Sequence, residues 1–180
     1  MECMMRRQLH SWKGFTLAEL LVVVAIVGIL VSVSIPVFTS QAEKSRETTD
    51  VANLRSAYSA ARYLSALGEF TVTDADGKNP KTYIWEADYP HLKGSSSGNA
   101  NPFFYDPDSG QIYYTCPKKP CGKGTSVDGG TKSIFFGKGE YRGDRDFRKA
   151  NIVIYFENSS DKGAISVYFG YKNGDAVVQH

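Results

Sequence analysis

Two cysteines close together offer the most definite covalent chemistry in this chain. Cys116 and Cys121 enclose Pro-Lys-Lys-Pro, so a disulfide between them would close a ring of six residues and contribute on the order of 2 kcal/mol. Two thiols, or half of a metal site, are the alternatives. The remaining cysteine, Cys3, lies near the N-terminus, and only His91 and His180 follow the apolar segment as further ligands. We expect the disulfide, and neither a metal nor a cofactor.

An acidic side chain at the edge of an apolar segment is the second feature that suggests chemistry. No residue from Leu20 to Ala42 is charged, most are Val, Ile or Leu, and Glu19 stands directly before them. A carboxylate in hydrocarbon is costly unless it is paired, so an acid in this place suggests a function. The alternative is a polar residue that is tolerated near a membrane interface.

Three further patterns resemble functional motifs. Asp74-Ala75-Asp76-Gly77 begins like a calcium loop, but its glycine comes two positions too early and the distal Glu is missing, so we expect a turn. Asn158-Ser159-Ser160 fits the glycosylation sequon, and a plain loop explains it equally. The sequence has neither Gly-x-Ser-x-Gly nor a phosphate loop, so we expect no enzyme.

The charge of the chain is concentrated in its first fourteen residues. The whole sequence has a formal charge of +2, and Arg6, Arg7 and Lys13 against Glu2 account for all of it. The remainder is neutral, so overall charge gives no argument for a nucleic-acid partner. The stretch 118–149 holds nine basic and four acidic residues among aromatic ones. Such a stretch fits DNA or an anionic surface, although solvated loops have the same composition.

The apolar segment 15–38 would span about 36 Å as a helix, enough to cross a bilayer core. The basic residues before it place the N-terminus in the cytoplasm and the rest outside, where Cys116 and Cys121 meet oxidising conditions. A secretory signal is the alternative, with Ser32-Val33-Ser34 as the cleavage site and Ile35 as the new N-terminus. An acid at position 19 does not fit such a signal.

The stretch Lys13-Gly14-Phe15-Thr16-Leu17-Ala18-Glu19-Leu20-Leu21 closely resembles the cleavage and methylation motif of bacterial type IV prepilins. The resemblance covers about residues 13–60. It implies that a prepilin peptidase cuts after Gly14 and methylates the new amine of Phe15. It also places the family's acid, five residues into the mature chain, at Glu19, and Gly28 and Pro36 at the positions where such helices loosen in filaments. Because a lone charge in lipid is costly, we expect Glu19 to pair with that amine on a neighbouring subunit, or within the same chain before assembly.

The resemblance further implies a structural subunit of a pilus that polymerises with identical copies. The precursor would cross the cytoplasmic membrane once, and the assembled filament would lie at the cell surface. An assembly ATPase and a membrane platform protein are the implied partners. Adhesion, motility and DNA uptake are all compatible with the sequence. A pseudopilin of a type II secretion or competence system is the alternative, because it shares the N-terminal motif.

The rest of the sequence predicts an α+β fold with the ladle architecture of pilins. Apolar residues at steps of three and four predict one helix over 15–67, with 39–67 covering a sheet and the polar stretch 41–50 solvated or bridging subunits. After a leader (1–14) and an apolar half-helix (15–38), residues 68–180 would form a head. We expect strands at 81–85, 103–105, 111–115, 134–136, 152–157, 164–171 and 176–179, the last three as a meander.

Overall fold

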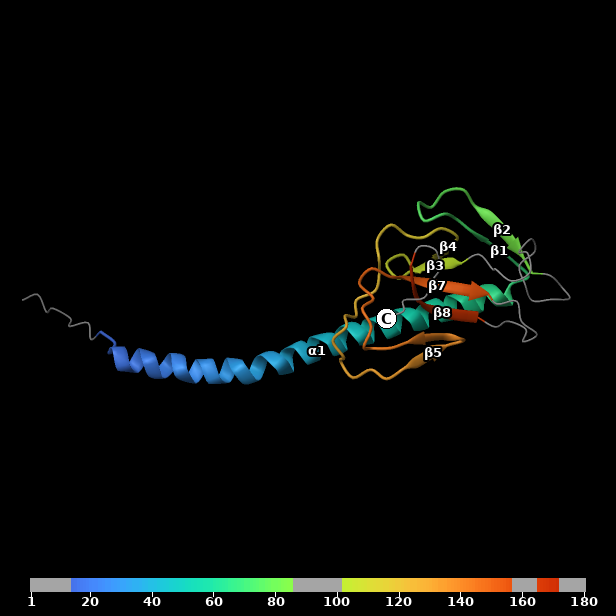
Figure 1. Ribbon diagram of the computed structural model, residues 1–180. Helices are drawn as coiled ribbons and strands as arrows, with labels where there is room; N and C mark the ends of the chain where they lie inside the picture. The colour runs from blue at the N-terminus through green and yellow to red at the C-terminus, as the bar shows by residue number, and fades with distance from the viewer. Residues whose placement is uncertain (1–13, 86–101, 157–164, 172–180) are drawn as a thin grey trace, which may run out of the picture. The chain divides into compact units, whose positions relative to one another are not determined.

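The computed structural model describes residues 14–85, 102–156 and 165–171, and it has the α+β fold that the sequence predicts. One helix, α1 (Leu17–Ala66), is followed by eight short strands that form antiparallel sheets (Figure 1). The chain divides into two units, Met1–Phe38 and Thr39–His180. The predicted helix over 15–67 is confirmed, and α1 runs without interruption through Gly28 and Pro36.

The second half of α1 is held by an apolar stripe. Val51, Leu54, Ala57 and Ala61 are all buried, and they recur at steps of three and four. The alanines give the strands close access to the helix. Leu67 and Gly68 leave the helical conformation, and glycine is common just beyond a helix C-terminus.

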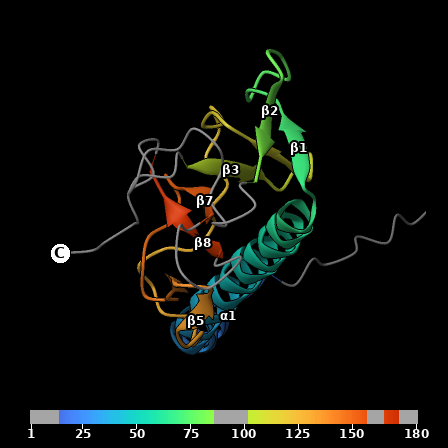
Figure 2. The same cartoon turned by 90° about the vertical axis from the view of Figure 1, so that its right-hand side faces the viewer.

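The main sheet packs on this stripe. Its order is β4 (Gln111–Tyr113), β3 (Phe103–Asp106), β7 (Asn151–Phe156) and β8 (Ile165–Gly170), and every neighbouring pair is antiparallel. Ile152, Ile154 and Val167 are fully buried in one core cluster with Leu54 and Ala57. Figure 2 shows α1 running beside these strands and β1 leaving from its C-terminal end.

Two hairpins flank the main sheet. β1 (Glu69–Val72) pairs with β2 (Lys81–Ile84), and β5 (Ile134–Phe136) pairs with β6 (Gly139–Tyr141). The second hairpin lies against β8, where a Cβ on Gly139 would come within 2.2 Å of the Val167 carbonyl oxygen. That oxygen belongs to the edge strand of the main sheet, so the hairpin covers the edge.

Most strand predictions are confirmed. The hairpin of 103–105 with 111–115 corresponds to β3 and β4, and its turn is closed by Asp106, which accepts a hydrogen bond from the Asp108 amide at 3.0 Å. The predictions at 134–136, 152–157 and 164–171 correspond to β5, β7 and β8. β1 and β6 were not predicted. The strand expected at 176–179 and the sequon at 158–160 lie outside the described residues.

Candidate functional site

The acid at the border of the apolar segment caps its own helix in this uncut chain. Oε2 of Glu19 accepts hydrogen bonds from the Thr16 amide at 2.8 Å and from the Thr16 hydroxyl at 2.9 Å. The Glu19 amide donates in return to the Thr16 hydroxyl oxygen at 3.2 Å. This reciprocal arrangement is a capping box, which satisfies amides at the first turn of a helix. The sequence pattern Thr-x-x-Glu is the signature of a capping box, but we did not predict the capping box from it.

Within the described residues, no tertiary contact buries the apolar half of α1. Every residue from Gly14 to Gln41 is exposed, and Phe15 is 91% exposed. Helix α1 has a mean hydropathy of 2.9 over its most apolar window of 18 residues, so by length and composition it could cross a membrane. Its two serine hydroxyls donate to helix carbonyls, Ser32 to Ile29 at 2.8 Å and Ser34 to Leu30 at 2.7 Å. These bonds leave an almost wholly apolar outer surface.

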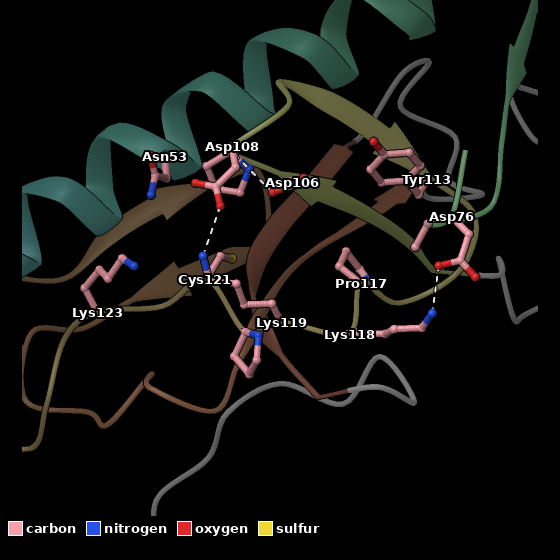
Figure 3. A pocket seen from close by; sticks show the side chains of 13 residues that line it. Asn53, Asp76, Asp106, Asp108, Tyr113, Pro117, Lys118, Lys119, Cys121 and Lys123 are labelled. Carbon is pink, nitrogen blue, oxygen red and sulfur yellow. Dashed lines mark hydrogen bonds and ion pairs between the residues drawn. The ribbon is translucent and has the colours of Figure 1, made fainter. Parts of the chain in front are cut away.

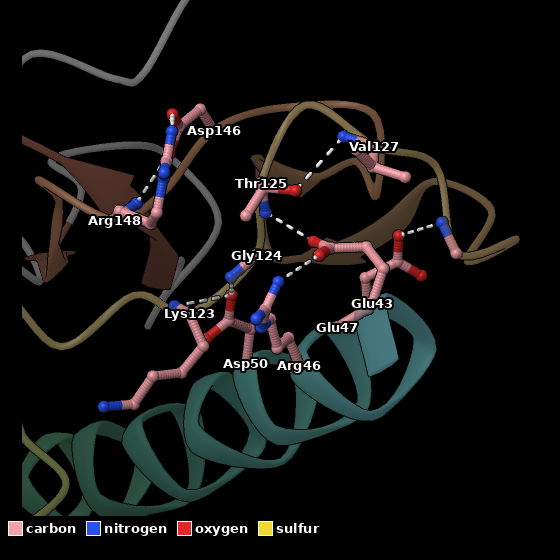
Figure 4. Close-up of polar contacts among 11 residues, drawn as sticks. Glu43, Arg46, Glu47, Asp50, Lys123, Gly124, Thr125, Val127, Asp146 and Arg148 are labelled. Carbon is pink, nitrogen blue, oxygen red and sulfur yellow. Dashed lines mark hydrogen bonds and ion pairs between the residues drawn. The ribbon is translucent and has the colours of Figure 1, made fainter. Parts of the chain in front are cut away.

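Three carboxylates on the next part of α1 form a second polar site. Glu43, Glu47 and Asp50 are spaced by four and three residues, so they share one face of the helix, and all three are at most 2% exposed. We call these three side chains the carboxylate ladder. Figure 4 shows that they point from α1 to the glycine-rich loop 122–131. The interpretation of 41–50 as a solvated or subunit-bridging stretch was wrong for these three residues, because they face the head of their own chain.

The carboxylate ladder binds backbone amides of that loop. Asp50 accepts from the Lys123 amide at 2.9 Å and from the Gly124 amide at 2.7 Å. Glu47 accepts from the Gly129 amide at 2.6 Å and from the Thr131 amide at 3.0 Å. Glu43 accepts from the Thr125 amide and also pairs with Arg46 at 3.0 Å. Five amides of an irregular loop thereby find acceptors on one helix, as buried backbone groups require.

Glycines allow the loop to approach α1 this closely. A Cβ on Gly129 would lie 2.5 Å from the Lys44 amide nitrogen, and one on Gly143 would lie 2.7 Å from Oε1 of Glu47. Two sequence signals could have revealed the site. The positions 43, 47 and 50 continue the buried stripe that includes Val51 and Leu54 toward the N-terminus, and the segment GKGTSVDGG supplies amides without bulky side chains.

Burial changes the acidity of the groups in and beside the carboxylate ladder. Burial raises the pKa of Asp50 to about 6, although the amides of Gly124 and Lys123 oppose the shift. For Glu43, burial is outweighed by the Thr125 amide and by Arg46, so its pKa is lowered. Burial and the three nearby carboxylates raise the pKa of Tyr141. The Tyr141 hydroxyl is buried, and within the described residues it has no hydrogen-bond partner.

Replacing Asp50 with asparagine should remove one pH-dependent part of the stability. The folded protein holds the Asp50 proton more tightly than the unfolded chain, whose ordinary pKa is near 3.8. The stability that this carboxyl contributes therefore falls as the pH rises from about 4 to about 6. We expect the stability of Asp50→Asn relative to the natural chain to improve across this interval by on the order of 3 kcal/mol.

Urea unfolding of both proteins between pH 4 and pH 7 measures this difference. Thr48→Val, an exposed change on the same helix, is the control and should show no such trend. A constant difference between Asp50→Asn and the natural chain would contradict the assignment.

The two cysteines are thiols in this structure, so the predicted disulfide stays a prediction. The Cys116 sulfur accepts a hydrogen bond from the Asn151 side-chain amide at 3.3 Å. Cys121 is half-buried, and burial raises its pKa to about 11, which makes it a weak nucleophile as a thiol. The loop between them lines a cleft of about 230 Å³ with the two turns β1–β2 and β3–β4 (Figure 3).

Four charged side chains that line this cleft form two ion pairs. Lys118 binds Asp76 at 2.8 Å and Lys119 binds Asp108 at 3.3 Å, and all four side chains are exposed. Arg142 and Arg148, from the same basic stretch 118–149, pair with Asp144 and Asp146. At least four of its nine basic residues thus meet an acid, so the stretch presents less uncompensated positive charge than its composition suggests.

The Asp74 segment is the turn that the sequence predicts. The Asp74 carboxylate accepts from the Lys78 amide at 2.7 Å and from the Asn79 side chain at 2.7 Å. Gly77 has a φ of 73°, which is the left-handed region that favours glycine. Within the described residues, no group of three or more His, Cys, Asp or Glu side chains is arranged to hold a metal.

Residues 13–35 match the family model of the prokaryotic N-terminal methylation motif. A fimbrial protein of Pseudomonas aeruginosa is 34% identical over 87 residues, which cover 48% of this chain and 56% of the relative. Fimbrial protein Q of Moraxella bovis is 37% identical over 75 residues, 41% of each chain. The type IV narrow pilus major component PilA5 of Thermus thermophilus is 46% identical over 52 residues, 27% of this chain and 45% of the relative.

The chain spans about half the length of these curated relatives, or somewhat less. No solved structure matches it. The matched residues cover the border of the apolar helix and include Gly14, Phe15 and Glu19. The chain thus carries the prokaryotic N-terminal methylation motif at the border of its apolar helix, and over about half of its length it is similar to fimbrial proteins.

Proposed function

We propose that this chain is the structural subunit of a type IV pilus and polymerises through the apolar half of α1. The observation that carries the proposal is the exposure of every residue of this half-helix, Phe15–Phe38, most of which lies within the matched methylation motif. An apolar surface of this size requires either lipid or other protein to cover it. Lipid covers it in the precursor, and copies of the same segment cover it in the filament.

Cleavage after Gly14 creates the group that Glu19 needs for assembly. In the uncut chain both donors of Thr16 bind Oε2, and within the described residues Oε1 accepts no hydrogen bond. The new amine of Phe15 is a positive charge that is also costly in an apolar setting. Glu19 of a neighbouring subunit, offset along the filament axis, pairs with this amine, and the pair favours one stagger between subunits.

Gly28 and Pro36 are the positions where we expect α1 to loosen in the filament. Both lie inside the continuous helix of the single chain. Proline has no amide hydrogen for the helix ladder, and glycine has the highest conformational entropy to regain. Loosening there would allow neighbouring apolar segments to pack at several angles.

The precursor is proposed to span the cytoplasmic membrane once, with the N-terminus inside. A prepilin peptidase, an assembly ATPase and a platform protein process and extract it, and the filament reaches the cell surface. The similarity to the pilus component PilA5 agrees with a filament subunit, and a pseudopilin is the alternative because it shares the N-terminal motif. Long surface filaments made of this chain, rather than short fibres within the envelope, are the expected product.

The mass of the mature protein from the producing cell tests this proposal. We expect a chain that begins at Phe15 with one methyl group on its amine. A chain that begins at Ile35 would instead identify a secreted protein with a cleaved signal, and an uncut chain would exclude processing. The same spectrum tests the proposed bridge between Cys116 and Cys121. It should show two hydrogens fewer than the reduced protein, and both cysteines should resist alkylation until reduction.

A further inference from the structure

Among the described residues, helix α1 has a first part whose side chains are all exposed and a second part that packs against the head. All residues from Gly14 to Gln41 are exposed, and the first buried side chain along the helix is Glu43. The boundary therefore coincides with the first member of the carboxylate ladder, eight residues before the apolar stripe begins at Val51.

We propose that the carboxylate ladder is a clamp that stops unwinding of α1 at Glu43. The helix can then loosen in its exposed half without pulling the head apart. This inference concerns the single chain and does not depend on the polymer.

The spacing of the carboxylate ladder requires helical backbone. Seven residues separate Glu43 from Asp50, about 10 Å along a helix but more than 20 Å along an extended chain. The five amides that bind the three carboxylates have fixed positions, so they match only the helical spacing. Unwinding through this stretch would leave buried amides without acceptors, at about 1–3 kcal/mol for each amide.

The loop cannot freely follow the helix if the helix unwinds, because its N-terminal part is bound to the rest of the head. The amides of Cys121 and Gly122 donate to the Ala150 carbonyl at 3.1 Å and 3.2 Å. The Phe147 amide donates to the Gly124 carbonyl at 2.9 Å, and Phe147 is 1% exposed. The donors of the clamp are therefore part of the folded head.

The exposed half of α1 has no comparable support. It is held by its intrahelical hydrogen bonds, and Pro36 removes one of them. An isolated helical stretch that neither lipid nor protein covers, such as the end that leaves the apolar segment, is only marginally stable in water. Loosening that begins near Pro36 therefore meets little resistance until it reaches Glu43.

Hydrogen exchange of the full-length chain in detergent micelles tests the clamp. We compare the natural chain with Glu47→Gln, which keeps the shape of the side chain but turns an NH₂ toward an amide donor. In mild urea, the amides of residues 43–50 should exchange at least tenfold faster in Glu47→Gln. Those of Leu54–Ala61 and of β7 should change less than threefold. Thr48→Val, on the exposed side of the same helical turn, is the matched control and should leave all rates within twofold.

Two outcomes would overturn the clamp. Unchanged exchange at residues 43–50 in Glu47→Gln would show that the bonds do not restrain the helix. Equal acceleration over the whole head would show that Glu47 supports only global stability. If Glu47→Gln does not fold, Glu43→Gln makes the same comparison. Glu43 accepts a hydrogen bond from one loop amide, that of Thr125, and forms an ion pair with Arg46.

Discussion

Replacing Glu19 with valine should leave cleavage after Gly14 intact and reduce the yield of assembled filaments at least tenfold. The peptidase motif up to Phe15 is unchanged in this variant, and valine suits the apolar segment. The variant loses the only carboxylate in Phe15–Phe38. The amine of Phe15 then enters an apolar environment without a partner, which is strongly unfavourable. The measurement is the amount of sheared filament per cell, with processing followed by mass.

The capping box makes a second explanation available, so the test needs variants that separate the two roles. Glu19→Gln keeps an oxygen that can accept from Thr16 but removes the charge. Thr16→Val removes the hydroxyl of the cap but keeps the carboxylate. If Glu19 acts through charge pairing, Glu19→Gln should assemble as poorly as Glu19→Val, and Thr16→Val should assemble nearly normally.

Normal assembly of Glu19→Gln together with poor assembly of Thr16→Val would instead assign Glu19 to helix capping. Normal filament yield from Glu19→Val would refute both roles. Failure of cleavage in the same variant would move the role of Glu19 from assembly to recognition by the peptidase.

The sequence predicted the features that depend on local patterns. The helix over 15–67 followed from apolar steps of three and four, and the hairpin near Asp106 followed from its turn residues. The motif around Gly14 and Glu19 is contiguous, so it could be read without a fold. In each of these cases the signal lies within a few residues of the feature.

The carboxylate ladder was not predicted, because its partners are more than seventy positions away in the chain. A helix with acids and bases in mixed order is usually solvated, and charge alone cannot show which side faces the protein. The useful signal was that Glu43, Glu47 and Asp50 lie on the same face of the helix as the apolar stripe. In hairpin β5–β6, strand β5 was predicted but β6 was not. β6 contains Gly139 where a strand pattern would have an apolar residue.

Gly129→Ala should lower the free energy of unfolding of the head by about 2–4 kcal/mol, the range of overpacked sites and broken buried hydrogen bonds. The added Cβ would lie 2.5 Å from the Lys44 amide nitrogen and 2.8 Å from Oε2 of Glu47. The first of these atoms belongs to the helix backbone and cannot turn away. Relief requires the loop to withdraw, which breaks the bond from the Gly129 amide to Glu47 at 2.6 Å.

Alanine substitutions at two other glycines, Gly130 and Gly68, serve as controls for backbone strain and for added volume. A Cβ on Gly130 would meet nothing within 4 Å, but Gly130 has a φ of 96°, so Gly130→Ala measures strain and should cost about 1–2 kcal/mol. Gly68 has open space and no positive φ, so Gly68→Ala should change stability by less than about 0.5 kcal/mol. Urea unfolding of the three variants gives the comparison. If Gly129→Ala were as stable as Gly68→Ala, the loop could not lie against α1 at the distance that the carboxylate ladder requires.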